Sequence, residues 1–98
     1  MPKRALWVTT YKAITDPAKL AQYASVGAPA ILAGGGRFVV RGMPSAVFEK
    51  GLMERTVVIE FPSVAAAIAT YDSPEYRKAL TLLDGGCERE IRICEMVE

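Results

Sequence analysis

Two arginines and a glutamate have residue types and spacing that would suit a small anion-binding site. Arg37 and Arg41 lie four residues apart in a β-branched segment, so strand alternation predicts that they share one face. Glu60, in the following apolar segment, is expected on the same face. An arginine there could present its planar guanidinium to a carboxylate or phosphate. The alternative is exposed cross-strand ion pairing with Glu60, which stabilises little.

A second polar group surrounds a break in the helical pattern at Asp72-Ser73-Pro74. Tyr71 and Tyr76 flank this break, and Asp72 lies within it. Phenol hydroxyls can act as weak acids or stabilise an oxyanion, so these three residues are candidates for lining a ligand pocket. The structural alternative places Tyr76 in the core and uses Asp72 to satisfy backbone amides. No residue is assigned a catalytic role.

Several classes of site are disfavoured by residue types that are missing. The chain contains no histidine, which removes histidine acid–base catalysis, most zinc sites and the commonest haem ligand. The triplet Gly34-Gly35-Gly36 lies between a predicted helix and a strand, the reverse of a phosphate-binding loop, and no Gly-Lys-Ser/Thr follows. We therefore expect neither a metal site nor a cofactor.

The elements that position these residues follow from β-branched runs, caps and glycines. Strands are predicted at 5–12, 37–42, 55–61 and 88–97. Asp16-Pro17 starts a helix that ends at the glycine triplet, and Pro29 should kink or break it near Gly27. Ser63 caps a short helix, and Ser73-Pro74 starts a second piece that ends at Gly85-Gly86.

This order, β-α-β-β-α-β with the last helix in two pieces, predicts one α+β domain of the ferredoxin-like type over 1–98. Right-handed crossovers give a four-stranded antiparallel sheet in the order 4-1-3-2, with the helices on one face. Alternation assigns to the helix-covered face the residues Leu6, Val8, Phe38, Val40, Val57, Ile59, Phe61, Ile91 and Ile93. The other face is then mixed apolar and charged, as in an isologous dimer, with Trp7, Tyr11, Val39 and Val58 as interface candidates.

Composition restricts the partners that this domain is expected to have. The 12 basic and 11 acidic residues give a net charge of +1, which argues against nucleic acid or an anionic membrane surface. No run approaches the ~20 apolar residues of a membrane span. The N-terminal residues lack the apolar core of a signal peptide, and the two cysteines are interpreted as reduced thiols, so a cytoplasmic protein is expected.

Three segments, GGGRFVVRG, RTVVIEFPSVAAAIATYDSPEYRKAL and IRICEMVE, resemble the domain-of-unknown-function 1330 family. The resemblance covers nearly the whole chain. It implies membership of the dimeric α+β-barrel superfamily, in which two sheets face each other in a homodimer, and it implies no firmly assigned activity. Members often carry an arginine just before the fourth strand, where this chain has Leu83. An anion site built on that arginine would be absent or replaced here.

Three hypotheses about function follow. The first is a homodimer that binds a small organic metabolite, anionic or aromatic. The second is an enzyme resembling cofactor-independent monooxygenases or isomerases of the superfamily, with Tyr71, Tyr76, Arg41 or Glu60 as polar groups. The third is a non-catalytic structural dimer. An enclosed pocket above about 300 Å³, lined by two or more of these groups, would favour the first two.

Overall fold

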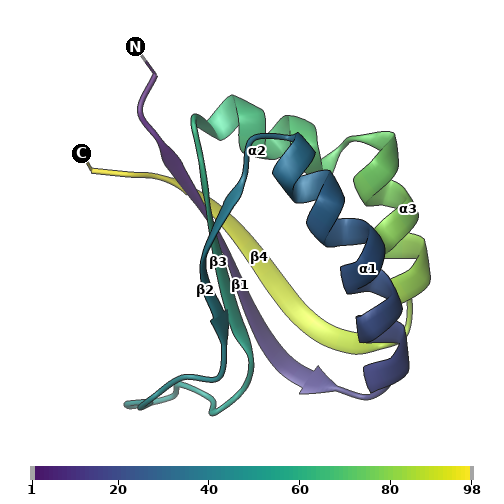
Figure 1. The fold of residues 1–98 in the computed structure, drawn as a ribbon. Coiled ribbons are helices and arrows are strands. Elements are labelled where there is room, and N and C mark those ends of the chain that lie inside the picture. The colour runs from purple at the N-terminus through teal and green to yellow at the C-terminus, as the bar shows by residue number, and fades with distance from the viewer. Residues whose placement is uncertain (1, 98) are drawn as a thin grey trace.

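The computed structural model describes residues 2–97. The elements in chain order are β1 (Ala5–Ile14), α1 (Pro17–Ala33), β2 (Arg37–Gly42), β3 (Thr56–Phe61), α2 (Val64–Tyr71), α3 (Pro74–Leu83) and β4 (Cys87–Glu95). The strands form one antiparallel sheet in the order β2-β3-β1-β4, which is the predicted order read from the other edge. The helices lie on one face of this sheet and leave the other face uncovered (Figure 1). The predicted ferredoxin-like α+β fold is confirmed.

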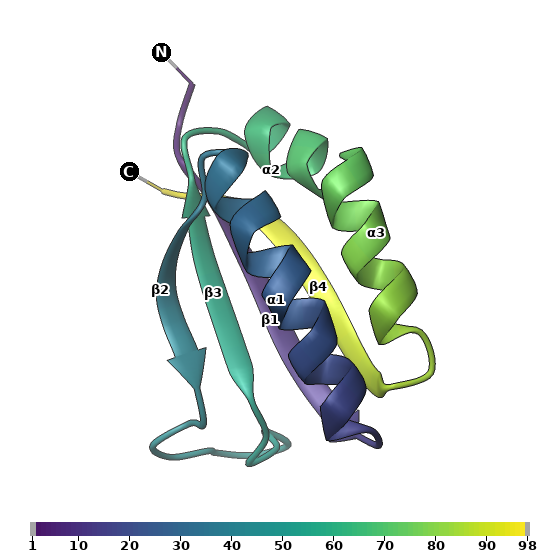
Figure 2. The same cartoon turned by 45° about the vertical axis from the view of Figure 1, so that its right-hand side comes forward.

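The helices begin at the capping residues that the sequence indicates. Asp16 accepts hydrogen bonds from the backbone N–H groups of Ala18 and Lys19, with Pro17 at the first helical position. Ser63 accepts from Ala66 N–H at the start of α2, and Ser73 accepts from Tyr76 N–H at the start of α3. Seen from a second direction, α1 and α3 run side by side across the sheet (Figure 2). The caps at Asp16 and Ser73 fix the starts of α1 and α3, and therefore the positions of Tyr23 and Tyr76 on them.

The break that was expected near Gly27 is wrong, because helix α1 continues from Pro17 to Ala33 and contains Pro29. Proline removes one backbone donor and costs about 3 kcal/mol in a helix interior. Tyr23, Ala30 and Ile31 on this helix are all buried in the core. Packing on both sides of Pro29 therefore offsets its cost. The helix ends at Gly34, and the following Gly35 adopts φ 98°, a left-handed conformation that favours glycine.

The face assigned to β1 is a second correction. Trp7 pairs with Ile59 and Thr9 pairs with Val57, and paired residues share a face of the sheet. Trp7 and Tyr11 are therefore under the helices, where only 1% and 4% of their surfaces are exposed. Their assignment to the uncovered face is wrong. Both alternating rows of β1 are apolar enough for a core, so only the pairing register selects between them.

A bulge in β2 produces a third correction. Phe38 pairs with Ile59 and Val40 with Val58, which leaves Val39 as an extra residue between the two pairs. The alternation shifts there, so Val40 lies on the uncovered face instead of the core. For the same reason Arg41, which pairs with Val57, lies on the helix-covered face. Arg37 stays on the uncovered face, opposite Glu60, and the expectation that the two arginines share a face is wrong.

Candidate functional site

The most distinctive polar group of the protein is the guanidinium of Arg89, which lies among three tyrosine hydroxyls beneath the helices. Its Nη1 donates to Tyr11 Oη at 3.4 Å and to Tyr23 Oη at 3.3 Å. Its Nη2 donates to Tyr76 Oη at 3.2 Å. The Tyr23 and Tyr76 hydroxyls are themselves 2.6 Å apart and share a hydrogen bond. We call these four residues the Arg89–tyrosine cluster.

Four elements bring this cluster together. Arg89 projects from β4, Tyr11 from β1, Tyr23 from α1 and Tyr76 from α3. Tyr11 pairs with Arg89 across the sheet, and the Tyr23 and Tyr76 rings meet edge-on at 5.9 Å between the helices. The guanidinium also lies over the Tyr23 ring, 4.8 Å from its centroid. The cluster as a whole therefore requires β1 and β4 to pair and both long helices to pack on them.

Two phenols of this cluster, those of Tyr11 and Tyr76, are protonated at physiological pH because their pKa values are raised. Burial raises the pKa of Tyr76 far above its ordinary value, and the nearby Tyr23 hydroxyl raises it further, although Arg89 opposes both effects. Burial likewise raises the pKa of Tyr11 against the lowering influence of Arg89. Arginine remains charged throughout this range. The cluster thus combines one fixed positive charge with protonated hydroxyls.

Arg89 has no acidic partner among residues 2–97. The described ion pairs involve Arg4, Lys12, Arg37, Arg77 and Arg92, and none places a carboxylate within 4.0 Å of Arg89. A half-buried charge without a counter-charge pays a desolvation cost that neutral hydroxyls offset only in part. The guanidinium therefore provides an electrostatic preference for an incoming anion.

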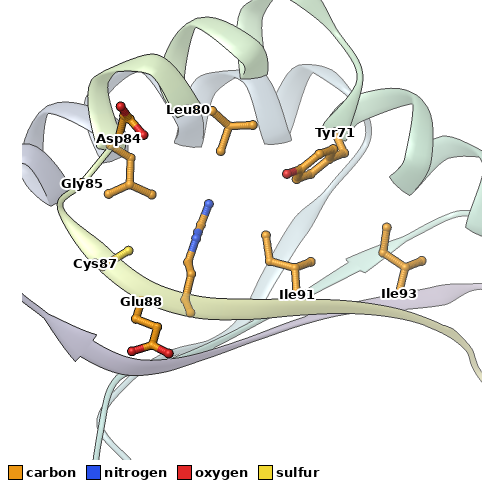
Figure 3. A pocket seen from close by; sticks show the side chains of 10 residues that line it. Tyr71, Leu80, Asp84, Gly85, Cys87, Glu88, Ile91 and Ile93 are labelled. Atoms are coloured by element: carbon orange, nitrogen blue, oxygen red, sulfur yellow. The ribbon is translucent and has the colours of Figure 1, made fainter.

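One side of Arg89 opens to a cleft of about 630 Å³ between β4 and α3. Its lining is mixed, because Asp84, Glu88 and Arg89 add polar surface to the side chains of Tyr71, Leu80, Ile91 and Ile93. The latter four project into the cleft from opposite sides (Figure 3). Cys87 also lines it, and burial raises the pKa of this thiol, so it is protonated at neutral pH. The volume falls within the range of small-molecule sites, about 300–1,000 Å³.

The predicted site residues do not gather in one place. Tyr76 belongs to the Arg89–tyrosine cluster and has no exposed surface, whereas Tyr71 lines the cleft. Asp72 is exposed and pairs with Arg77 at 3.1 Å. Arg41 lines a different, smaller cavity. Of the five predicted ligand-binding residues, Tyr71 alone lines the large cleft. The cleft therefore does not have the two or more predicted polar groups that were expected to favour a ligand site.

Glu60 lies on the other face of the sheet and pairs with Arg4 and Arg37. Hydrogen bonds from Arg4 first, and from Arg37 second, hold the pKa of this carboxyl below its usual range. The structural alternative for Arg37 and Glu60, a cross-strand ion pair, is the arrangement found. This pair does not take part in the cleft.

Sequence reasoning missed Arg89 and Tyr23, although each carried a signal. Arg89 stands two residues before Ile91 and four before Ile93, so it continues the core row of its strand. Tyr23 stands three residues after Leu20 and four before Gly27, on the core side of α1. A charged residue at a position where the alternation predicts a core side chain is unusual, and it indicates a candidate functional group. Leu83, at the position where the family resemblance implied an arginine, is buried and lines the same cleft as Arg89.

Residues 2–97 contain neither a metal-binding cluster nor a membrane-spanning helix. No group of three or more Cys, Asp or Glu side chains in this range could hold a metal ion. No helix among the described residues is long and apolar enough to cross a membrane.

Comparison with known proteins agrees on the fold. Residues 4–97 match the family described as "Domain of unknown function (DUF1330)". A protein of unknown function from Rhodopseudomonas palustris has a similar structure, with a TM-score of 0.79 and 15% identity over 100% of this chain and 85% of that one. No curated protein shows significant sequence similarity to the chain.

Two other solved structures have the same fold. A dimeric ferredoxin-like protein of unknown function from Thermobifida fusca has a TM-score of 0.66 and 16% identity, over 98% of this chain and 93% of that one. SnoaB, a cofactor-independent oxygenase from Streptomyces nogalater, has a TM-score of 0.67 and 15% identity, over 98% and 95% of the two chains. At these identities the similarity shows a shared fold.

Proposed function

Because the chain belongs to the DUF1330 family, whose description assigns no activity, we propose its function from its own residues: a homodimer that binds a small organic anion. The observation that carries this proposal is the Arg89 guanidinium, which has three tyrosine hydroxyls as partners and no carboxylate within 4.0 Å among residues 2–97. A ligand carboxylate or phenolate would supply the missing counter-charge.

The cleft walls define the rest of the ligand. Leu80, Leu83, Ile91 and Ile93 offer apolar contact, and Tyr71 offers an aromatic surface. The carboxylates of Asp84 and Glu88 are exposed at the rim, and Glu88 points away from the cleft across β4 (Figure 3). A ligand with one acidic group and an aromatic or aliphatic body fits this arrangement, whereas a polyanion would meet the rim carboxylates. The proposed ligand is therefore a monoanionic aryl or short alkyl acid.

A library of paired ligands tests the proposal directly. Each aromatic or aliphatic monocarboxylic acid is compared with its neutral primary amide by calorimetric titration, because the two have nearly the same shape. We expect acids to bind about tenfold or more tightly than their amides, the difference that a charge-assisted hydrogen bond provides. Equal affinities within each pair, or no binding by any acid at millimolar concentration, would contradict an Arg89-directed anion site.

The homodimer is proposed through the uncovered face of the sheet. Leu6, Val8, Val40 and Val58 share this face, and Val39 and Val40 are 49% and 45% exposed. Apolar side chains exposed on a contiguous surface indicate a partner. The similar Thermobifida fusca protein is itself described as dimeric. In this arrangement the helices and the cleft stay on the outside of the dimer.

Replacing Val58 with Asp should convert the dimer to monomers, because the new carboxylate would have to be desolvated at the interface. Light scattering at micromolar concentration should give twice the mass of one chain for the native protein and one chain mass for the variant. Ile68→Asp is the control, since Ile68 is 48% exposed on α2 rather than on the sheet. A monomeric native protein would refute the dimer.

An enzyme that resembles cofactor-independent monooxygenases or isomerases is the second candidate function. The observation that favours it is that the cluster places protonated phenols beside a guanidinium, a combination that stabilises an enolate or phenolate. The similar structure of SnoaB, described as a cofactor-independent oxygenase, adds support. Oxygen uptake with dihydroxy-aromatic substrates, without added metal or cofactor, separates an enzyme from a binding protein.

The expected location, the cytoplasm, is supported by the free thiols of Cys87 and Cys94.

A further inference from the structure

A second, narrower cavity shares Arg89 with the cleft. It has a volume of about 50 Å³ and lies between α1 and the sheet. Three arginines line it, each from a different part of the sheet: Arg41 on β2, Arg55 just before β3, and Arg89 on β4. Its other lining residues are apolar, aromatic or hydroxyl-bearing, and none is acidic. Arg41 is exposed, whereas Arg55 and Arg89 are half-buried, and no lining residue carries a negative charge to balance the three guanidinium groups.

The bulge at Val39 is what brings Arg41 to this cavity. Without the extra residue, Arg41 would have the same alternation as Arg37 and would lie on the uncovered face. With it, the Arg41 side chain passes over the Phe38 ring, its Cζ 4.4 Å from the ring centroid. Bulges commonly re-aim one side chain at a functional position. The local irregularity of β2 thus places a cation where regular pairing would not.

The cations of this cavity differ from the other arginines in their partners. Arg4, Arg37, Arg77 and Arg92 each have a carboxylate within 4.0 Å. Among residues 2–97 no such pair involves any of the three cavity arginines. Like charges around a shared space repel one another, and an anion between them relieves that repulsion. The charge distribution therefore favours occupation by an anion.

A hydroxyl donor also faces the cavity. Thr9 lines it and is 1% exposed. Its Oγ1 accepts a hydrogen bond from Trp7 Nε1 at 2.9 Å, and its own hydroxyl proton has no acceptor among the hydrogen bonds of the described residues. Since a buried hydroxyl normally donates as well as accepts, this proton is available to an oxygen atom in the cavity.

The volume limits the size of the anion. A water molecule needs roughly 10–15 Å³ of such space, so about 50 Å³ accommodates roughly three to five water-sized positions. Formate, bicarbonate and phosphate have this size, whereas an aryl acid does not. We propose that the three-arginine cavity is a second ligand site, distinct from the cleft, which binds a free compact oxyanion.

The test is thermal unfolding in formate, bicarbonate or phosphate against chloride at matched ionic strength and pH. We expect at least one of the three to raise the midpoint saturably. Arg41→Gln and Thr9→Val should each weaken the apparent affinity for that oxyanion by about tenfold, the effect of one charge-assisted or buried hydrogen bond. Pivalate, a bulky carboxylate, should have no saturable effect that depends on Arg41.

Arg37→Gln is the matched control, because it removes the same charge from the same strand on the opposite face. It should leave the oxyanion affinity unchanged. The proposal is overturned if none of the three oxyanions stabilises the protein saturably, or if Arg37→Gln weakens binding as much as Arg41→Gln. Aryl acid binding in the cleft is measured separately on Arg41→Gln and should persist, so failure of one site does not imply failure of the other.

Discussion

Replacing Arg89 with methionine is expected to weaken binding of organic acids strongly while the protein stays folded. The guanidinium is the positive charge of the cleft, and loss of its contact should cost about tenfold to a hundredfold in affinity. Stability should change by no more than about 1 kcal/mol, because removal of a half-buried charge without a counter-charge offsets the lost hydrogen bonds to the tyrosines. These bonds are 3.2–3.4 Å long, towards the weak end of the range. Calorimetric titration and urea unfolding measure the two effects.

Arg92→Met is the matched control for this experiment. Arg92 lies three residues further along β4, on the uncovered face, exposed and paired with Glu90. Its replacement should alter neither acid binding nor stability appreciably. If Arg89 has a purely structural role, the Arg89→Met variant should instead lose several kcal/mol of stability. Its ligand affinity should then be unchanged in the molecules that remain folded.

Replacing Trp7 with alanine should lower the free energy of unfolding by about 3–5 kcal/mol, the usual cost of truncating a buried large aromatic side chain. Trp7 stacks on Phe61 at 5.8 Å and meets Tyr76 edge-on at 5.2 Å. Its Nε1 donates to Thr9 beneath the helices. Truncation would therefore leave a cavity at the centre of the core and remove the donor to a buried hydroxyl.

The dependence of this loss on protein concentration separates a core residue from an interface anchor. If Trp7 acts inside one protomer, urea unfolding of the Trp7→Ala variant should show the same stability deficit at low and high micromolar concentration. Val58→Ala, on the uncovered face, should show its main deficit at low concentration, where dimers dissociate. If the Trp7→Ala variant is a folded monomer whose protomer is as stable as the native one, Trp7 acts at the dimer interface and not in the core.

The core and the candidate site share residues, which links stability to binding. Tyr76 packs against Trp7 and Tyr71 within the core, and its hydroxyl contacts Arg89 at the edge of the cleft. The cluster is therefore held by rigid packing rather than by loops. Such pre-organisation lowers the cost of ordering the site when a ligand binds.

Local sequence signals predicted most of the fold correctly. The caps Asp16, Ser63 and Ser73 begin the helices where expected, since each effect depends on a few neighbouring residues. The order of elements then led to the sheet topology through the handedness of crossovers. Pro29 was misjudged because its local cost is outweighed by contacts with distant residues.

The site was predicted less well, because its members lie far apart in the sequence. Tyr71 and Tyr76 were identified from a local helix break, and both lie at or beside the cleft. Arg41 was identified as a candidate, but it was assigned to the wrong face of the sheet. The bulge at Val39 that changes its face arises from pairing with β3, which local sequence does not reveal. Arg89 was overlooked, since its importance depends on tyrosines up to 78 residues away.

The amino-acid sequence alone specified the elements, their caps, their order and the family, because local backbone preferences and motif spacing carry that information. The tertiary structure decided which row of β1 enters the core, which side of β2 carries Arg41, and which hydroxyls surround Arg89. A shift of one residue in strand register exchanges the two faces of a strand, and both rows of β1 contain apolar residues. Only the packing of the whole chain distinguishes those alternatives, and the candidate site depends on the outcome.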